Sequence, residues 1–235
     1  MGQASSDPDV ARFGPLHLLA LAVARKGRLG LLLQGSSHWQ RTPGYTLVPA
    51  ALPGGVREPE STTEAALTAL AVRWLGQAAQ IRGSRQLYGP SAVHTMDRLP
   101  ANPEDAPLPV LRFERSAPLY VAATPMVRRV IVSVYRVRLA GPPQPHAEAA
   151  GLLWLSPAAL RLAMRGSPLA DLLAHTGAQW HRGPDGAAAP AEALPDDAFI
   201  YVPGEYGERH LLRLVAKYGP EALFQGEDGT GVPEP

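Results

Sequence analysis

Cysteine is absent from the 235-residue sequence, which excludes disulfides, thiolate zinc sites and cysteine nucleophiles together. An excess of charge of one sign is also lacking, because 22 basic and 21 acidic residues leave a formal net charge of +1. These charges are interspersed rather than gathered in a basic tail, so they do not indicate nucleic-acid binding. Any metal site must use oxygen or imidazole ligands.

Long apolar runs are missing as well. The stretch 16–24 is far shorter than the roughly 20 residues that span a bilayer. The polar N-terminus contains Asp7 and Asp9 where a signal peptide would carry basic residues and then an apolar run. We therefore expect a soluble, cytoplasmic protein with no membrane partner.

Several motifs of known chemistry are also missing. The seven histidines show no HxH or HExxH spacing, which argues against zinc. No Gly-x-Ser-x-Gly elbow and no Gly-x-x-x-x-Gly-Lys loop occurs, which argues against a serine hydrolase and a P-loop nucleotidase.

Hydrophobic patterning predicts strands in both halves of the chain. Apolar runs at 16–23 and 29–33 flank a basic, Gly-containing turn, which is typical of a hairpin. The alternating β-branched run 129–139 predicts the clearest strand. Shorter strands are expected at 46–52, 110–115 and 151–155. Four prolines in 97–109 predict an extended loop there.

Helix signals are clearest from Ser61 to Leu75, where Ser61 is the expected N-cap and Glu64 its capping-box partner. Ser156-Pro157 and Ser167-Pro168 each have the sequence of an N-cap followed by a first-turn proline, which predicts two short helices. A last amphipathic helix is expected at 208–217, after a flexible connection at 183–197.

These elements predict a mixed sheet flanked by helices, an α/β fold of the α+β type. We expect the domain to cover 14–176, with a C-terminal extension at 177–225. Residues 1–13 and 226–235 are expected to be disordered.

The most informative segment runs from Leu52-Pro53-Gly54-Gly55 through Glu58 and Glu60 to Glu64-Ala65-Ala66-Leu67. It resembles the first half of the Nudix box, and the later strand 129–139, Glu148 and the 152–157 stretch resemble the same family. The resemblance covers roughly 14–176. It implies the Nudix fold and a Mg²⁺-dependent hydrolase of nucleoside diphosphate derivatives.

The second half of the box departs from the family. Its Arg-Glu-Leu falls on Thr68-Ala69-Leu70 and its Glu-Glu pair on Val72-Arg73. Positions 69, 72 and 73 share one helical face, where carboxylates would hold Mg²⁺. Alanine and valine offer no ligand, and Arg73 would repel a cation by a few kcal/mol at about 4 Å. We expect no cofactor, and Mg²⁺ only if activity remains, with Glu60 and Glu64 as its ligands. Otherwise the negative charges of the box glutamates stabilise the N-terminus of the helix.

Three functions stay open. The first is a Nudix-like domain that has lost hydrolysis and is a nucleotide-binding, regulatory or scaffolding module. Its candidate partners are a nucleotide or nucleoside diphosphate derivative and a second copy of the chain. The second is a hydrolase with a rearranged site, and the third is a purely structural interaction module. The candidate ligand-binding residues are Arg73, Gly54, Gly55, Arg57, Trp39 and Tyr45. The candidate catalytic residues of the second function are Glu60, Glu58 and Glu148.

Two of these assignments have plainer alternatives. Arg73 is either a phosphate ligand or the partner of Glu58, Glu60 or solvent in a salt bridge. Trp39 and Tyr45 either line a pocket mouth or pack within their loop.

Overall fold

The computed structural model describes residues 14–76, 79–91, 95–102, 106–121, 124–145, 148–174, 178–181 and 194–224. The segments expected to be disordered, 1–13 and 226–235, lie outside these ranges. Most of the flexible connection expected at 183–197 lies outside them as well.

The centre of the sheet is formed by β1 (Leu16–Arg25), which lies between β2 (Arg28–Gln34) and β10 (Thr124–Leu139). β1 pairs with β2 in antiparallel fashion and with β10 in parallel, so the sheet is mixed. The described residues contain 14 strands, joined along the path β12-β14-β4-β2-β1-β10-β9-β7-β8. The hairpin expected from the apolar runs at 16–33 is confirmed.

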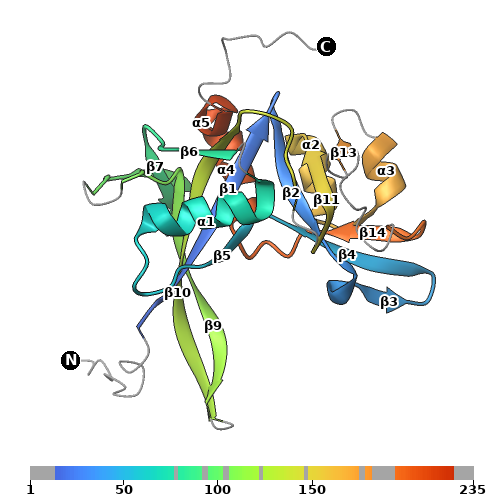
Figure 1. Cartoon of the computed structure of the whole chain (residues 1–235), viewed down its shortest axis with the longest axis horizontal. Helices are drawn as coiled ribbons and strands as arrows, with labels where there is room; N and C mark the ends of the chain where they lie inside the picture. Colours follow the sequence, from blue (N-terminus) through green and yellow to red (C-terminus); the bar gives the residue numbers. More distant parts are fainter. Residues whose placement is uncertain are drawn as a thin grey trace.

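The remaining strands extend this sheet or pair with its members. They are β3 (Gln40–Thr42), β4 (Tyr45–Ala51), β5 (Gly54–Val56), β6 (Ala79–Arg82), β7 (Leu87–Pro90), β8 (Met96–Leu99), β9 (Leu111–Val121), β11 (Ala149–Leu155), β12 (Ser167–Pro168), β13 (Gln179–His181) and β14 (Ala198–Tyr201). β9 and β10 form a long hairpin that projects beyond the rest of the molecule (Figure 1).

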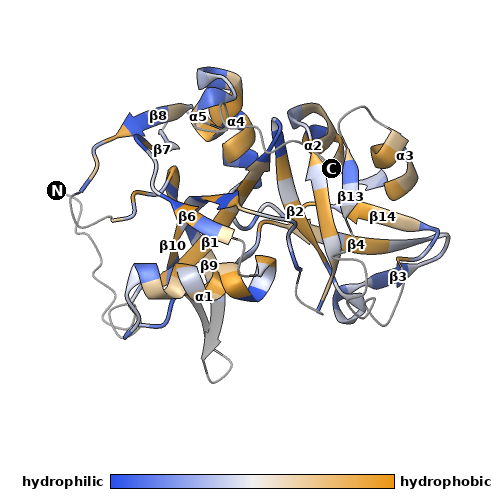
Figure 2. Ribbon diagram, turned by 45° about the horizontal axis from the view of Figure 1, so that its top comes forward, coloured by the Kyte–Doolittle hydropathy of each residue, from blue (hydrophilic) through white to orange (hydrophobic). Residues whose placement is uncertain are grey.

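Helices cover both faces of the sheet (Figure 1). They are α1 (Thr63–Leu75), α2 (Pro157–Ala163), α3 (Leu169–Ala174), α4 (Glu208–Tyr218) and α5 (Glu221–Phe224). Because strand side chains alternate, β1 contributes Leu19, Leu21 and Val23 to the core under α1. Its intervening residues Leu18 and Ala20 join the larger core that contains α4. Figure 2 shows hydrophobic residues along β2, β4 and β14, within this larger core.

The fold class expected from the sequence, a mixed sheet flanked by helices, is therefore confirmed. The C-terminal extension is part of the same assembly, because β13 pairs with β11 and β14 pairs with β4. None of the helices in the described ranges has the length and apolarity to cross a membrane.

The expected N-cap of α1 is wrong. Thr62 is the cap, and its Oγ1 accepts a hydrogen bond from the Ala65 N–H at 3.2 Å. The Ser61 hydroxyl instead donates to the Thr62 carbonyl at 3.3 Å. The cap position is one residue later, so Glu64 is not at the third helical position that a capping box needs.

Two further expectations need correction. The proline-rich loop expected at 97–109 begins inside β8, which pairs with β7, a strand that the sequence did not reveal. Ser167-Pro168 forms a short strand paired with β14, and the short helix expected after it is present as α3. By contrast, Ser156 caps α2 as expected, accepting the Ala159 N–H at 3.2 Å, and Pro157 begins the helix.

Candidate functional site

The glycine turn of the box lies between the two cores. β5 pairs with β1 so that Gly55 is opposite Leu19 and Gly54 is opposite Ala20. A methyl group on Gly55 would lie 2.8 Å from Leu70 Cδ2, on the α1 side. A methyl group on Gly54 would lie 2.8 Å from both the Leu19 carbonyl and the Tyr206 ring, on the opposite side. A side chain at Gly54 would clash with backbone, whereas one at Gly55 would require the Leu70 side chain to move.

The side chains of α1 that meet these glycines are not those expected from the box, because they lie one position later in the helix. Leu70 touches Gly55, and Trp74 donates its indole N–H to the Gly54 carbonyl at 3.1 Å. Ala69 is exposed, and Val72 is 48% exposed. Leu70 and Trp74, four residues apart on one helical face, thus meet the glycine turn in place of Ala69 and Val72.

Arg73 lies at the edge of this face and pairs with Glu148. Its Nη2 is 3.1 Å from Glu148 Oε2, and the two side chains are 54% and 62% exposed. The Arg73 guanidinium carbon also lies 4.8 Å from the centre of the Trp74 ring. The structure thus brings together two residues singled out from the sequence, but the partner of Arg73 is Glu148 rather than Glu58 or Glu60.

The residues present do not fit the Mg²⁺ site that the family resemblance implies. Leu70 and Trp74 carry no oxygen ligand, and Trp74 occupies the Gly54 carbonyl with a hydrogen bond. The single carboxylate at the site, Glu148, is paired with a guanidinium. Within the described ranges, no group of three His, Asp or Glu side chains gathers as a metal site would need.

The other box glutamates lie at the opposite end of α1. Glu58 and Glu60 are exposed in the loop before the helix, where the Glu58 carbonyl accepts the Ser61 N–H at 3.0 Å. Glu64 is exposed in the first helical turn. The rise of a helix separates this turn from Arg73 by about 15 Å. Glu58 and Glu60 are thus not brought together with Glu148.

Arg57 belongs to a second group, beneath the first turn of α1. Its backbone N–H donates to the His17 carbonyl at 2.9 Å, and its Nη1 donates to Thr63 Oγ1 at 3.1 Å. The pKa of His17 is lowered, first by burial and then by the positive charges of Arg57 and Arg112. Arg57 therefore contributes to a positive region of the sheet face, separate from Arg73.

The two aromatic candidates in the preceding loop are engaged by neighbours. The Trp39 indole donates to the Gln34 carbonyl at 2.7 Å and the ring packs against the larger core. Tyr45 lies 5.2 Å from the Phe199 ring at the start of β4. A strand rise of about 3.3 Å per residue places Tyr45 some 20 Å from the box. Trp39 thus contacts its own loop and the core, whereas Tyr45 contacts β14.

Sequence reasoning missed Glu208, the first residue of α4. Its side chain is fully buried, and its Oε1 accepts the Leu52 N–H at 2.9 Å, directly before the glycine turn. Its Oε2 has no hydrogen-bond partner in the described part of the chain. Burial raises the pKa of Glu208, and the backbone N–H of Leu52 opposes that shift. The two residues are 156 positions apart, so no local pattern signals this contact.

No protein-family model and no curated protein matches the chain. Solved structures, several of them described as Nudix hydrolases, resemble it at low sequence identity. A protein from Jonesia denitrificans, described as a possible asymmetric diadenosine tetraphosphate hydrolase, is 18% identical with a TM-score of 0.41, covering 89% of this chain and 96% of its own. A MutT Nudix hydrolase from Burkholderia pseudomallei is 17% identical with a TM-score of 0.34, covering 62% and 86%. An ADP-ribose pyrophosphatase from Streptococcus suis is 13% identical with a TM-score of 0.34, covering 61% and 75%.

Proposed function

We propose that the chain is a Nudix-type domain that does not hydrolyse pyrophosphates and acts as a nucleotide-binding, regulatory module. The observation that carries this proposal is the ion pair between Arg73 and Glu148, beside the hydrogen bond from Trp74 to Gly54. A guanidinium and an indole take the place of metal-binding carboxylates.

Hydrolysis is disfavoured because the positive charge of Arg73 opposes the binding of a metal cation. Metal-assisted phosphoryl chemistry needs a cation that bridges the phosphate oxygens and offsets developing negative charge. At this face a cation would lie beside Arg73 and would have to remove Glu148 from its partner. Coulomb repulsion of a few kcal/mol at about 4 Å and intermediate dielectric opposes that exchange.

The positive charge of Arg73 favours the binding of a phosphate group at this face of α1. The ion pair is more than half exposed, and exposed pairs contribute at most about 1 kcal/mol. A diphosphate group offers the guanidinium a bidentate, doubly charged partner in place of Glu148. The Trp74 ring lies beneath the guanidinium and adds a cation–π contact to it.

A hydrolysis screen and a stability assay test the proposal together. The screen covers nucleotide sugars, dinucleoside polyphosphates and nucleoside triphosphates with Mg²⁺ or Mn²⁺, and we expect no turnover. The same compounds with EDTA should raise the melting temperature of the wild type but not of Arg73→Ala. Arg161→Ala, which removes an exposed arginine from α2, is the matched control and should respond as the wild type does. Glu148→Gln frees Arg73 and should increase the response.

Two outcomes would contradict the proposal. Metal-dependent turnover that is lost in Glu60→Gln or Glu148→Gln would establish a hydrolase with a rearranged site. The absence of a stability shift across the whole panel would favour a structural interaction module.

We also propose a homodimer, supported by the projecting β9–β10 hairpin, on which Val127 is 59% exposed. Sedimentation velocity of the wild type should give a mass twice that of the 25.0 kDa chain. The Val127→Lys variant should give a lower mass. A monomer at all concentrations would rule the dimer out.

A further inference from the structure

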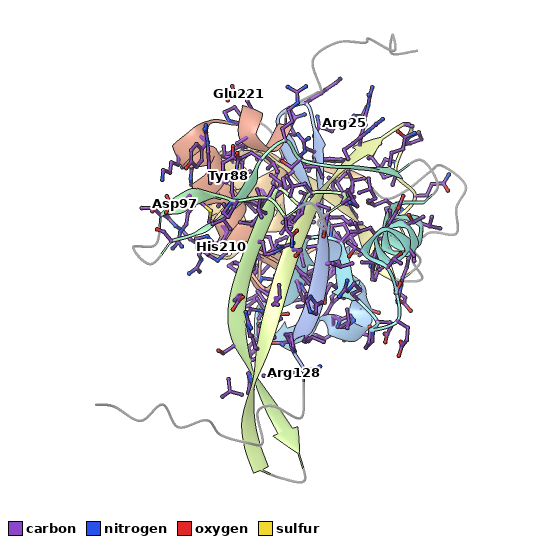
Figure 3. The ribbon with its side chains drawn as sticks, turned by 90° about the vertical axis from the view of Figure 1, so that its left-hand side faces the viewer. Arg25, Tyr88, Asp97, Arg128, His210 and Glu221 are labelled. Atoms are coloured by element: carbon purple, nitrogen blue, oxygen red, sulfur yellow. The ribbon has the colours of Figure 1, made fainter. Side chains whose placement is uncertain are left out.

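A pocket lies at the turn between β1 and β2, at the other end of these strands from the box. Its volume is about 160 Å³, and it is lined by Arg25, Lys26, Arg28, Trp154 and Gln179. Among the described residues that line it, none is acidic. Figure 3 shows Arg25 toward the end of the molecule opposite Arg128. The β-strand rise separates Trp154 from Glu148 by about 20 Å, so the pocket is independent of the box.

The turn places Arg25 and Arg28 in an unfavourable arrangement. Arg25 and Arg28 are directly paired across the hairpin, and like charges in that position repel. In the described ranges, neither forms an ion pair. The two turn residues Lys26 and Gly27 have φ of +48° and +71°, as a two-residue type I′ turn requires. A lysine at a positive φ is strained, and strain of this kind clusters at functional sites.

The floor of the pocket is rigid. Trp154 is only 5% exposed and pairs with Gly30 on one side and Gln179 on the other. A methyl group on Gly30 would lie 3.1 Å from the Trp154 ring, so the glycine makes room for the indole. Val23, opposite Gly30, is fully buried. Side chains that stand two residues apart on a strand share a face, which places Arg25 and Arg28 beside this floor.

We propose that this pocket binds the phosphate group of a small phosphorylated molecule. The guanidiniums of Arg25 and Arg28 supply the donors that phosphate oxygens need and can bind them in bidentate fashion. The volume is below the roughly 300 Å³ at which drug-sized pockets begin. The pocket therefore accommodates a phosphoryl group and leaves the rest of the ligand outside, against Gln179 and the exposed turn.

Binding of inorganic phosphate and of ribose 5-phosphate to the full chain tests this inference. Both are titrated at constant ionic strength while the amide resonances of Lys26 and Gly27 are followed by NMR. We expect saturable shifts at these amides. The double variant Arg25→Ala/Arg28→Ala should bind at least about tenfold more weakly, about 1.4 kcal/mol. The double variant Arg161→Ala/Arg165→Ala loses the same charge from exposed positions and should bind as the wild type does.

The possible results distinguish the ligand classes and include two that would overturn the inference. Tighter binding of ribose 5-phosphate than of phosphate supports a phosphorylated metabolite as the ligand, and equal binding supports free phosphate. Equal weakening in both double variants would mean a general charge effect and would overturn the inference. Shifts caused by a DNA duplex but by neither small phosphate would overturn it as well, in favour of nucleic-acid binding.

Discussion

Replacing Glu208 tests how the C-terminal helix is held on the box. The carboxyl group is fully buried, with one oxygen on the Leu52 N–H and the other without a partner in the described residues. Glu208→Ala removes the acceptor and leaves the Leu52 N–H buried and unsatisfied, which costs about 1–3 kcal/mol. For a chain of this size, a loss of about 2 kcal/mol lowers the melting temperature by roughly 4–8 °C.

Glu208→Gln should behave differently, because the amide oxygen can accept the same hydrogen bond without carrying charge. The raised pKa of Glu208 means that the folded state binds a proton more tightly than the unfolded state does. Its contribution to stability is complete below the ordinary carboxyl pKa of 4.5 and is lost as the pH rises through the folded pKa. The glutamine variant lacks this loss, so its stability relative to the wild type should increase with pH.

Urea unfolding of the wild type and both variants between pH 5 and pH 9 measures these effects. The negative charge of Glu205 raises the pKa of Glu208 further, so Glu205→Gln should lower that pKa, shift the pH dependence to lower pH and serve as a useful control. The reasoning would be refuted if Glu208→Gln were as unstable as Glu208→Ala at every pH. It would also be refuted if the difference between wild type and Glu208→Gln did not change with pH.

Three smaller perturbations address the surrounding sites. Arg73→Ala should lower the free energy of unfolding by at most about 1 kcal/mol in urea titrations, because the pair with its carboxylate partner is mostly exposed; a larger loss would contradict this. The imidazole of His17 should titrate below its ordinary pKa of 6.5 in NMR spectra, and Arg57→Ala should raise that pKa; an unchanged value would exclude the proposed charge effect. Gly35→Ala should destabilise by about 1–3 kcal/mol in thermal unfolding, because its methyl group would lie 2.4 Å from a backbone oxygen, whereas Gly14→Ala meets nothing within 4 Å and should be neutral.

The parts of the fold that the sequence predicts are those in which local pattern and packing agree. The apolar runs on either side of Lys26-Gly27 predict the central hairpin, because the turn type and the burial of both strands act together. Ser156-Pro157 predicts the start of α2 because both residues act within one helical turn. The cap of α1 is missed by one residue, since Ser61 and Thr62 are both favourable N-cap residues and serine is the more favourable of the two in isolation.

The site was predictable only in outline. The box pattern indicates that the glycine turn and the following helix lie together, but the helical face that meets the glycines depends on how α1 packs on the sheet. The Arg73–Glu148 pair joins residues 75 positions apart and depends on the register between β2 and β11. Such contacts have no local signal, because sheet register is set by tertiary packing.

That one-residue shift of the helical face leads to a last prediction. If positions 73 and 74 face the glycine turn, Arg73→Glu/Trp74→Glu should create a cluster of three carboxylates with Glu148, suited to a hard cation. Mn²⁺ binding, measured by electron paramagnetic resonance, should then be at least about tenfold tighter than in the wild type. Ala69→Glu/Val72→Glu adds the same number of carboxylates to the exposed side of α1 and should not bind Mn²⁺ more tightly. Circular dichroism verifies that both variants fold. Equal gains in the two would mean that added negative charge alone attracts the ion, and a gain confined to Ala69→Glu/Val72→Glu would restore the face expected from the box sequence.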